Sequence, residues 1–384
     1  MALTLSRRLL IQSAAATALL PLAKVPALAA PTTIDVCTDG DTNISDWWTN
    51  TLKPAFEKAH PEFSLNIVIT RANGGNLTVA QRVVAAKKTS TDAKVDFFEE
   101  FDPRELPGAI EAGAFTKVDE TVVPNWALLN PLGKAETPFA IPYRASQVLI
   151  AYDSAKVKET PKSWAEITAW IKANPGQFIY CRPDKGGSGS HFVMRAVHEA
   201  NGRDPSLFKP ENFDAEKAKK LFAPAWALLN DIQPFLYDKG AYPAGNNPTL
   251  QLFAGGAVSM ISAWSDQALQ GISQGVLPET TKLTQLQDLA LSGGFAFSSI
   301  PATTVHKEGA AKLADFALSP EMQAKMIADF GAFPGIDWKN LPAELAEKYK
   351  AIIPTSMPFF PGGQWEAALV DGWYANVATH LTRS

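Results

Sequence analysis

The chain has 384 residues, 46% of them hydrophobic, and carries a formal net charge of −4. This length suits two domains of ordinary size. No run of Lys and Arg provides the electrostatic footprint that nucleic-acid binding requires, and beyond the N-terminal segment no stretch is apolar enough to cross a membrane. We therefore expect a soluble globular protein that binds no DNA or RNA and is not an integral membrane protein.

The N-terminal segment has the pattern of an export signal. Arg7-Arg8 precedes an apolar run over 14–22, and Ala27-Leu28-Ala29 provides a small-residue cleavage site. The apolar run is too short to span a bilayer, which takes about 20 apolar residues. We predict that 1–29 is a cleaved twin-arginine signal peptide and that the mature protein is periplasmic. An amphipathic N-terminal helix of a cytosolic protein is the alternative.

The first half of the mature chain alternates predicted strands and helices. Apolar runs predict strands at 33–37, 64–70 and 95–98, and helical spacing predicts a helix capped by Asp46 and another over 77–88. Acidic residues directly follow the third strand. The carboxyl ends of strands in open α/β sheets are where ligands bind.

The second half repeats this alternation. Strands are expected at 147–152, 177–181 and 293–300, and 254–260 is expected to turn into another buried strand. Ser163 and Glu166 form a predicted capping box, Asp214 is expected to cap a helix that ends at 230, and 310–330 is expected to be helical. No low-complexity linker separates the halves, so crossing strands are expected to join two lobes.

Several blocks resemble the extracellular solute-binding proteins of ATP-binding-cassette (ABC) importers. These blocks are Ile141-Pro142-Tyr143-Arg144, Leu149 to Asp153, Pro161 to Glu166, Phe253 to Met260, Gly293-Gly294-Phe295, Leu313 to Gln323 and Phe333-Pro334. Their order and spacing cover the mature chain, and they are most similar to the iron, polyamine and thiamine-like branch.

The resemblance implies an α/β fold of two lobes, each a mixed sheet flanked by helices, with a ligand cleft between them. It implies a monomer that closes on a small solute and delivers it to a membrane permease powered by an ATPase. Neither catalysis nor a cofactor is implied. The expected division is 30–145 with 293–335 in the first lobe, and 146–292 with 336–384 in the second.

One candidate binding constellation suits an anion. The loop 186–190, with Ser188, Gly189 and Ser190, precedes a predicted helix, so free N–H groups and the helix dipole would converge on it. Arg182 could add a bidentate contact. A side chain at Gly189 would then obstruct the ligand more than it would lower stability. A turn with an ordinary helix cap is the alternative.

A second constellation suits a cationic group. Its acids are Asp39, Asp41, Glu99 and Glu100 in the first lobe, with Asp102 beside them; Trp264 and Asp266 would form a cation-binding wall in the second. Tyr143 is the aromatic residue expected in the cleft at the crossing, and Arg144 is expected to form a structural salt bridge across the hinge. Solvated loop acids and a core tryptophan are the alternatives.

Other functions and features stay open at this stage. An exported hydrolase could use Glu99 and Glu100 as its acid and base, although neighbouring strand residues point in opposite directions. A receptor without transport is another possibility. The ligand could be thiamine-like, a polyamine or an aminophosphonate, and Cys37 and Cys181 could pair. The histidines have no metal-ligand spacing, so no metal is expected.

Overall fold

The computed structural model describes residues 30–40, 42–70, 75–134 and 138–383. The predicted signal peptide over 1–29 and the candidate Asp41 lie outside these ranges. None of the described helices is long and apolar enough to cross a membrane.

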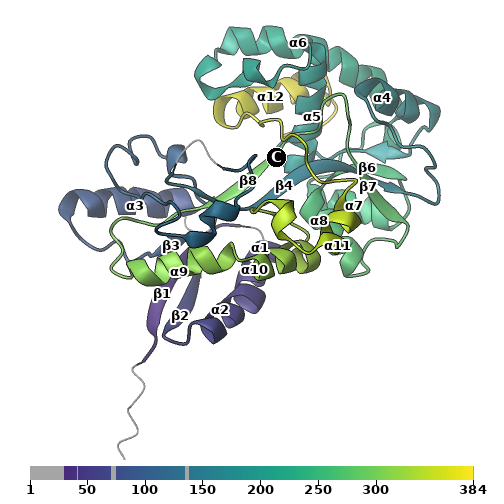
Figure 1. The fold of residues 1–384 in the computed structure, drawn as a ribbon. Coiled ribbons are helices and arrows are strands. Elements are labelled where there is room, and N and C mark those ends of the chain that lie inside the picture. The colour runs from purple at the N-terminus through teal and green to yellow at the C-terminus, as the bar shows by residue number, and fades with distance from the viewer. Residues whose placement is uncertain (1–29, 41, 71–74, 135–137, 384) are drawn as a thin grey trace, which may run out of the picture.

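Two lobes make up the protein, and β4 and β8 run between them (Figure 1). The sheet of the first lobe has the order β2-β1-β3, from parallel strands β1 (Thr32–Thr38), β2 (Phe63–Ile69) and β3 (Phe97–Phe98). These are the three strands that the apolar runs predict. Side chains that alternate along β1, such as Ile34 and Val36, are fully buried against the helices.

The helices of the first lobe follow its strands. α1 (Thr42–Trp47) continues through a π-helical turn (Trp48–Leu52) into α2 (Lys53–Ala59), and α3 (Gly75–Thr89) follows β2. Asp46 therefore lies inside a helix, and the prediction that it caps one is wrong. The sequence pattern placed the start too late because Ile44 and Trp47 already form part of the buried face.

The second lobe has a sheet in the order β5-β6-β4-β7. Its strands are β5 (Phe178–Ile179), β6 (Met260–Trp264), β4 (Ile141–Asp153) and β7 (Thr281–Thr284). The helices of this lobe are α4 (Trp164–Ala173), α5 (Gly187–Ala200), α6 (Ala215–Ile232), α7 (Asn246–Ala254), α8 (Ser265–Ser273) and α12 (Gly363–Asn376). The sequence analysis did not anticipate β7, which is short and mostly half-exposed.

Strand β4 belongs to both lobes and forms the main crossing between them. Its first half pairs with β8 (Gly293–Ser298) and β9 (Phe333–Pro334), and its second half pairs with β6 and β7. The change of partner falls between Gln147, opposite Gly293, and Val148, opposite Trp264. The sequence analysis places the crossing near 145–148, and the change of partner lies within this range.

The C-terminal part of the chain is divided between the lobes. Trp338, Tyr349 and Ile352 pack in the same hydrophobic cluster as β1, with Trp338 against Tyr349 at a ring separation of 6.3 Å. That segment includes α11 (Ala343–Tyr349). Only the last part of 336–384 packs on the second lobe, where Trp365 and Trp373 of α12 are buried against α5 and α6. The segment expected in the second lobe therefore begins in the first.

The observed starts of the helices show which of the predicted capping residues are correct. Ser163 caps α4 by accepting the N–H of Glu166 at 3.2 Å, but the Glu166 carboxylate accepts the N–H of Lys162, so the capping box is only half formed. Asp214 caps α6 as predicted. The helical stretch near the C-terminus is α9 (Lys307–Ala317) and α10 (Pro320–Lys325), separated where Ser319 caps the second helix.

Cys37 and Cys181 are both free thiols. Cys37 packs in a cluster of the first lobe, whereas the Sγ of Cys181 lies 3.3 Å from the carbonyl oxygen of Gly186 in the second. The possibility of a disulfide between them is therefore contradicted.

Candidate functional site

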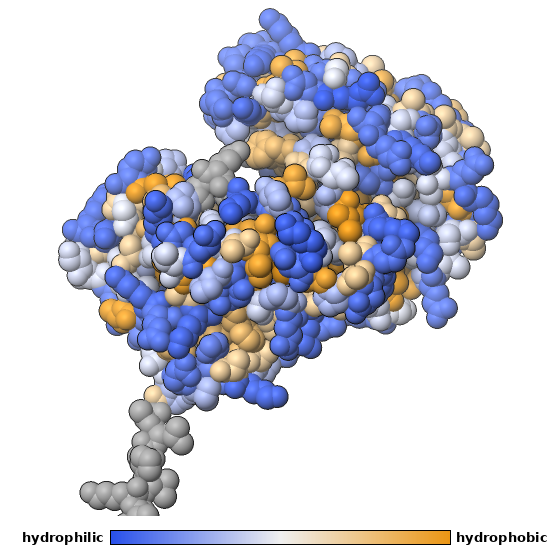
Figure 2. Space-filling view, in the orientation of Figure 1, coloured by the Kyte–Doolittle hydropathy of each residue, from blue (hydrophilic) through white to orange (hydrophobic). Residues whose placement is uncertain are grey.

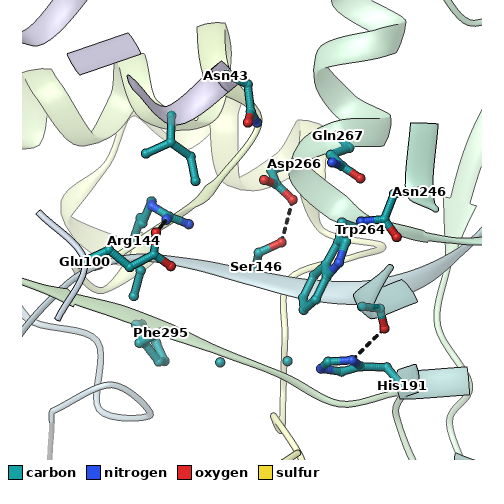
Figure 3. Close-up of a pocket in the computed structure, with 15 residues that line it drawn as sticks. Asn43, Glu100, Arg144, Ser146, His191, Asn246, Trp264, Asp266, Gln267 and Phe295 are labelled. Carbon is teal, nitrogen blue, oxygen red and sulfur yellow. Dashed lines mark hydrogen bonds and ion pairs between the residues drawn. The ribbon is translucent and has the colours of Figure 1, made fainter. Parts of the chain in front are cut away.

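A cavity of about 460 Å³ lies between the lobes at the crossing strands. Figure 2 shows the hollow between the two bodies, and Figure 3 shows the side chains that line it. The first lobe contributes residues of α1, β4 and β8 and the segment after β3; the second contributes residues of α5, α7 and α8 and the end of β6. Such a cavity can contact a ligand from both sides at once.

An ion pair dominates the wall from the first lobe. The Arg144 guanidinium lies 2.7 Å from a carboxylate oxygen of Glu100, and both residues line the cavity. Arg144 also donates from Nε to the hydroxyl of Tyr143 at 2.6 Å. Although burial opposes its charge, Glu100 and Glu99 raise the pKa of Arg144. Arg144 therefore forms a salt bridge, but its partner is in the first lobe and not across the hinge as predicted.

Glu99 lies beneath this ion pair and does not line the cavity. Its side chain is fully buried and accepts hydrogen bonds from the hydroxyls of Thr38, at 2.6 Å, and Tyr143. Burial, and then the neighbouring Glu100 carboxylate, raise the pKa of Glu99 to about 8. Glu99 is therefore mostly protonated at neutral pH, and the cluster of Glu99, Glu100 and Arg144 has little net charge.

Two expectations for this wall need correction. Tyr143 was expected in the cleft, but it is 1% exposed and packs on Trp48 at 5.9 Å between ring centroids. Glu99 and Glu100 do not face one space, because successive side chains of an extended segment point to opposite sides. Only Glu100 of the two reaches the cavity, so Glu99 and Glu100 do not form the facing acid and base of the hydrolase alternative.

A second carboxylate lines the cavity across from that ion pair. Asp266 lies in the first turn of α8, directly after β6, and accepts a hydrogen bond from the Ser146 hydroxyl at 2.6 Å. Asp266 is 7% exposed, and no cation of the described residues forms an ion pair with it. Its negative charge is thus held in place by a neutral hydroxyl and faces the cavity (Figure 3).

Aromatic rings complete the wall from the second lobe. The His191 ring lies 4.7 Å from the Trp264 ring, edge to face, and stacks on Phe360 at 4.1 Å. Gly187 lies against the Trp264 indole, where an added Cβ would approach within 2.9 Å of it. The glycine therefore lets the helix α5 approach the indole closely.

The expected anion-binding loop is the first turn of α5. The N–H and the hydroxyl of Ser188 both donate to Oδ1 of Asn246, at 3.2 and 2.9 Å, and the N–H of Gly189 donates to Gly186. Ser190 donates its hydroxyl to Gly187. The groups expected to bind an anion are thus already bonded within the protein, and Ser188, Gly189 and Ser190 are buried behind the cavity wall.

Two further candidates lie away from this cavity. Arg182 donates from Nε to the carbonyl oxygen of Tyr242 at 3.2 Å and does not line the cavity. Asp39 accepts the N–H of Asn76 at 2.7 Å and borders a neighbouring cavity of about 420 Å³ beside Glu100. Asp102, considered with the acids, binds the Arg104 guanidinium.

A second chamber of about 690 Å³ continues from the cavity, and Asn43 and Gln267 line both. Amide side chains of the π-helical turn after α1 and of α7 and α8 dominate its walls, including Asn50, Gln251 and Gln270. Oε1 of Gln267 is buried without a hydrogen-bond partner from the described residues. The second chamber is thus rich in amides and also contains the carboxylates of Asp46 and Asp329.

The sequence analysis placed Glu100, Trp264 and Asp266 among the candidates, and all three line the cavity. It missed Asn43, His191, Asn246, Gln267 and Phe295. The only signal for Gln267 was its place beside Asp266. His191 directly follows the glycine-rich segment, and the sequence analysis considered the histidines only as metal ligands.

Two α/β lobes, crossing strands and a cavity between them define a two-lobed binding protein of the periplasmic type. The family model of the bacterial extracellular solute-binding proteins matches residues 51–353, and the chain belongs to this family. It is 23% identical to the Escherichia coli protein YnjB over 363 residues, which cover 89% of each chain. It is 24% identical to the putrescine-binding periplasmic protein SpuD of Pseudomonas aeruginosa, over 60% of this chain and 62% of SpuD.

Solved structures agree on the fold. A candidate extracellular solute-binding protein from Bordetella parapertussis superposes with a TM-score of 0.69 at 17% identity, over 91% of this chain and all of that one. The spermidine/putrescine-binding protein PotD of Streptococcus pneumoniae superposes with a TM-score of 0.64 at 13% identity, over 91% of this chain and all of PotD. The predicted two-lobed α/β fold is confirmed.

Proposed function

We propose that this protein is the periplasmic substrate-binding component of an ABC importer and that it captures a small polar organic solute bearing a cationic amine. The observation that carries the proposal is Asp266, a nearly buried carboxylate that faces the cavity beside the Trp264 indole. A carboxylate paired with an aromatic face attracts an ammonium group by charge and by the ring quadrupole.

The charges of the remaining wall favour a cation over an anion. Among the described residues that line the cavity, Arg144 is the one basic side chain that carries a charge at neutral pH, and Glu100 already neutralises it. Because Glu99 is mostly protonated, Asp266 leaves the site with about one net negative charge. An anionic ligand would have to displace Glu100 from Arg144, whereas a cation needs no such rearrangement.

Capture would proceed by closure of the lobes. A ligand that contacts Asp266 on one side and α1 on the other binds the closed state better than the open one, and it shifts the population accordingly. The hinge is the segment of β4 where its pairing changes from β8 to β6. The closed form would then deliver its ligand to a membrane permease driven by an ATPase.

The relative SpuD, named for putrescine binding, gives independent support for an amine ligand. Putrescine carries an ammonium group at each end of a short chain. The amide-rich chamber beside Asp266 offers hydrogen-bond acceptors to the far end of such a molecule.

Titration calorimetry of the mature protein against a panel of amines, amino acids and organic phosphates tests this function. We expect amines to bind, and Asp266→Asn to weaken that binding at least tenfold, since a charge-assisted contact contributes about 1.5–3 kcal/mol. Asp231→Asn is the control, because Asp231 pairs with Lys172 on the outer surface. Binding of phosphates alone, or of amines equally by both variants, would reject the cationic class.

Solution scattering tests the mechanism. An amine that binds should reduce the radius of gyration, because both lobes contact it. A bound ligand that causes no compaction would argue against hinge closure, and turnover of that ligand would favour a hydrolase.

Export by the twin-arginine pathway is a separate part of the proposal, carried by Arg7-Arg8. Replacing both arginines by lysine should leave uncleaved precursor in the cytoplasm. Normal periplasmic accumulation of that variant would reject this pathway.

A further inference from the structure

His191 lines the cavity with one ring nitrogen already fixed. Its Nδ1 lies 2.7 Å from the carbonyl oxygen of Gly187, one turn earlier in α5. A carbonyl oxygen can only accept a hydrogen bond, so Nδ1 must carry the proton. A neutral imidazole has only one N–H group, and its Nε2 is then an acceptor.

The ring is held firmly in this orientation. It stacks on Phe360 with planes 13° apart and meets the Trp264 ring edge to face. His191 is 7% exposed, and no hydrogen bond from the described residues reaches its Nε2. Figure 3 shows the ring extending from α5 toward the cavity, with its bonded Nδ1 on the Gly187 side.

Burial keeps this ring neutral. It lowers the pKa of His191 to about 4, although the hydrogen bond to Gly187 acts in the opposite direction. A protonated ring would place a second donor and a positive charge beside Trp264. The neutral ring instead offers a lone pair at neutral pH.

We infer that His191 is a specificity-determining residue whose Nε2 accepts a hydrogen bond from an N–H or O–H group of the solute. This inference rests on the proposed function and narrows the ligand class from cations in general to those with a hydrogen-bond donor near the charge. Asp266 supplies the opposite charge, and a trimethylated ammonium would satisfy Asp266 while leaving Nε2 unpaired. An acceptor left unpaired in a closed cavity costs free energy.

The first test needs no ligand. In the mature protein labelled with ¹⁵N-histidine, the His191 resonances, assigned with His191→Phe, should report a neutral Nδ1–H tautomer that does not titrate between pH 5.5 and 8. An Nε2–H tautomer, or a charged ring at pH 6.5, would overturn the inference.

The second test compares ethanolamine with ethyltrimethylammonium, a cation of similar size that has neither an N–H nor an O–H group. His191→Phe keeps the stacking on Phe360 and removes both ring nitrogens. We expect it to weaken the binding of ethanolamine at least fivefold and that of ethyltrimethylammonium less than twofold, and ethanolamine should shift the Nε2 resonance. His60→Gln is the control, because His60 lies on the first lobe beside Glu62 and should leave both affinities unchanged.

The outcomes separate this inference from the proposed function. His191→Phe could unfold at the wild-type temperature and yet lose affinity equally for both compounds. That result would reject the acceptor role of His191 and leave the proposed function standing. If no amine of the calorimetric panel binds the wild-type protein, the cationic class is rejected, and this inference with it.

Discussion

The two walls of the cavity use charge in different ways. On the wall from the first lobe, Arg144 and Glu100 bind each other at 2.7 Å and rest on the buried Glu99. On the opposite wall, Asp266 is held by a neutral hydroxyl at 2.6 Å, and His191 leaves one nitrogen unpaired. The charges of the first wall are therefore paired with each other. The second wall retains a carboxylate that has no ion-pair partner among the described residues and a ring nitrogen that has no hydrogen bond from them.

This difference indicates that the two walls have different roles. Groups whose charges already compensate each other form a stiff surface against which a ligand can be enclosed. Groups without a protein partner select the ligand, because only the ligand can satisfy them. Substitutions on the first wall should therefore affect stability, and substitutions at Asp266 and His191 should affect binding.

The largest expected effect is on the packing beneath the second wall. A Cβ at Gly189 would lie 2.0 Å from the carbonyl oxygen of Cys181, so Gly189→Ala must displace α5 from the sheet. We expect a loss of more than about 3 kcal/mol in the free energy of unfolding, at the upper end for overpacked positions. Urea denaturation followed by fluorescence measures it.

Gly362→Ala is the matched control, because nothing lies within 4 Å of its added Cβ and it should stay within about 0.5 kcal/mol of wild type. The sequence-based interpretation of 186–190 as an anion-binding loop expects binding, rather than stability, to suffer at Gly189. A stable Gly189→Ala variant with altered binding would therefore favour that interpretation.

The second effect tests the ion pair of the first wall. Arg144→Met removes the guanidinium but keeps an apolar side chain of similar length. Removing one partner of a buried pair costs about 3–5 kcal/mol. We expect about 2–3 kcal/mol here, because Glu100 is 38% exposed and can be hydrated and Glu99 is mostly protonated. Thermal unfolding of the unliganded variant measures this, and an unchanged midpoint would contradict an ion pair important for stability.

The third effect is the pH dependence that Glu99 confers. Its pKa is raised from 4.5 to about 8 by burial and by Glu100, so between these values the folded state binds more protons than the unfolded state. Stability from this group is complete at low pH and decreases as pH rises toward 8, by at most about 1.4 kcal/mol per pH unit. Glu99→Gln should remove this slope, which denaturation at pH 5.5, 6.5 and 7.5 would measure. Parallel curves for both proteins would contradict a protonated Glu99.

Much of the fold could be predicted from the sequence, because the burial of β1, β2 and β6 follows local apolar runs. Glu100, Trp264 and Asp266 were found because each follows a strand, and strand ends meet at the ligand edge of such sheets. The direction of a side chain was harder to predict. Tyr143 turns into the core to reach Glu99, 44 residues earlier in the chain.

The structure differs from the predicted anion-binding loop for a related reason. Whether the N–H groups at the start of α5 are free depends on Asn246, which lies 58 residues beyond Ser188 in the chain. Only the folded chain brings this amide to the helix terminus. Likewise, the acceptor character of His191 depends on its own ring contacts, which a helical pattern does not specify.

The smallest expected effect is that of Glu100→Gln on ligand binding. Glu100 lines the cavity as Asp266 does, but its charge is already paired with Arg144. Loss of the Glu100 charge also lowers the pKa of Glu99, whose carboxylate lies 3.6 Å from the same guanidinium. Glu99 can then ionise and replace the missing charge, so the wall stays nearly neutral.

We expect the affinity of Glu100→Gln for ethanolamine at pH 7.5 to change less than about threefold, which corresponds to less than 0.7 kcal/mol. Titration calorimetry of Glu100→Gln and Asp266→Asn under the same conditions measures this. Equal losses of affinity in the two variants would mean that the first wall also selects the ligand by charge.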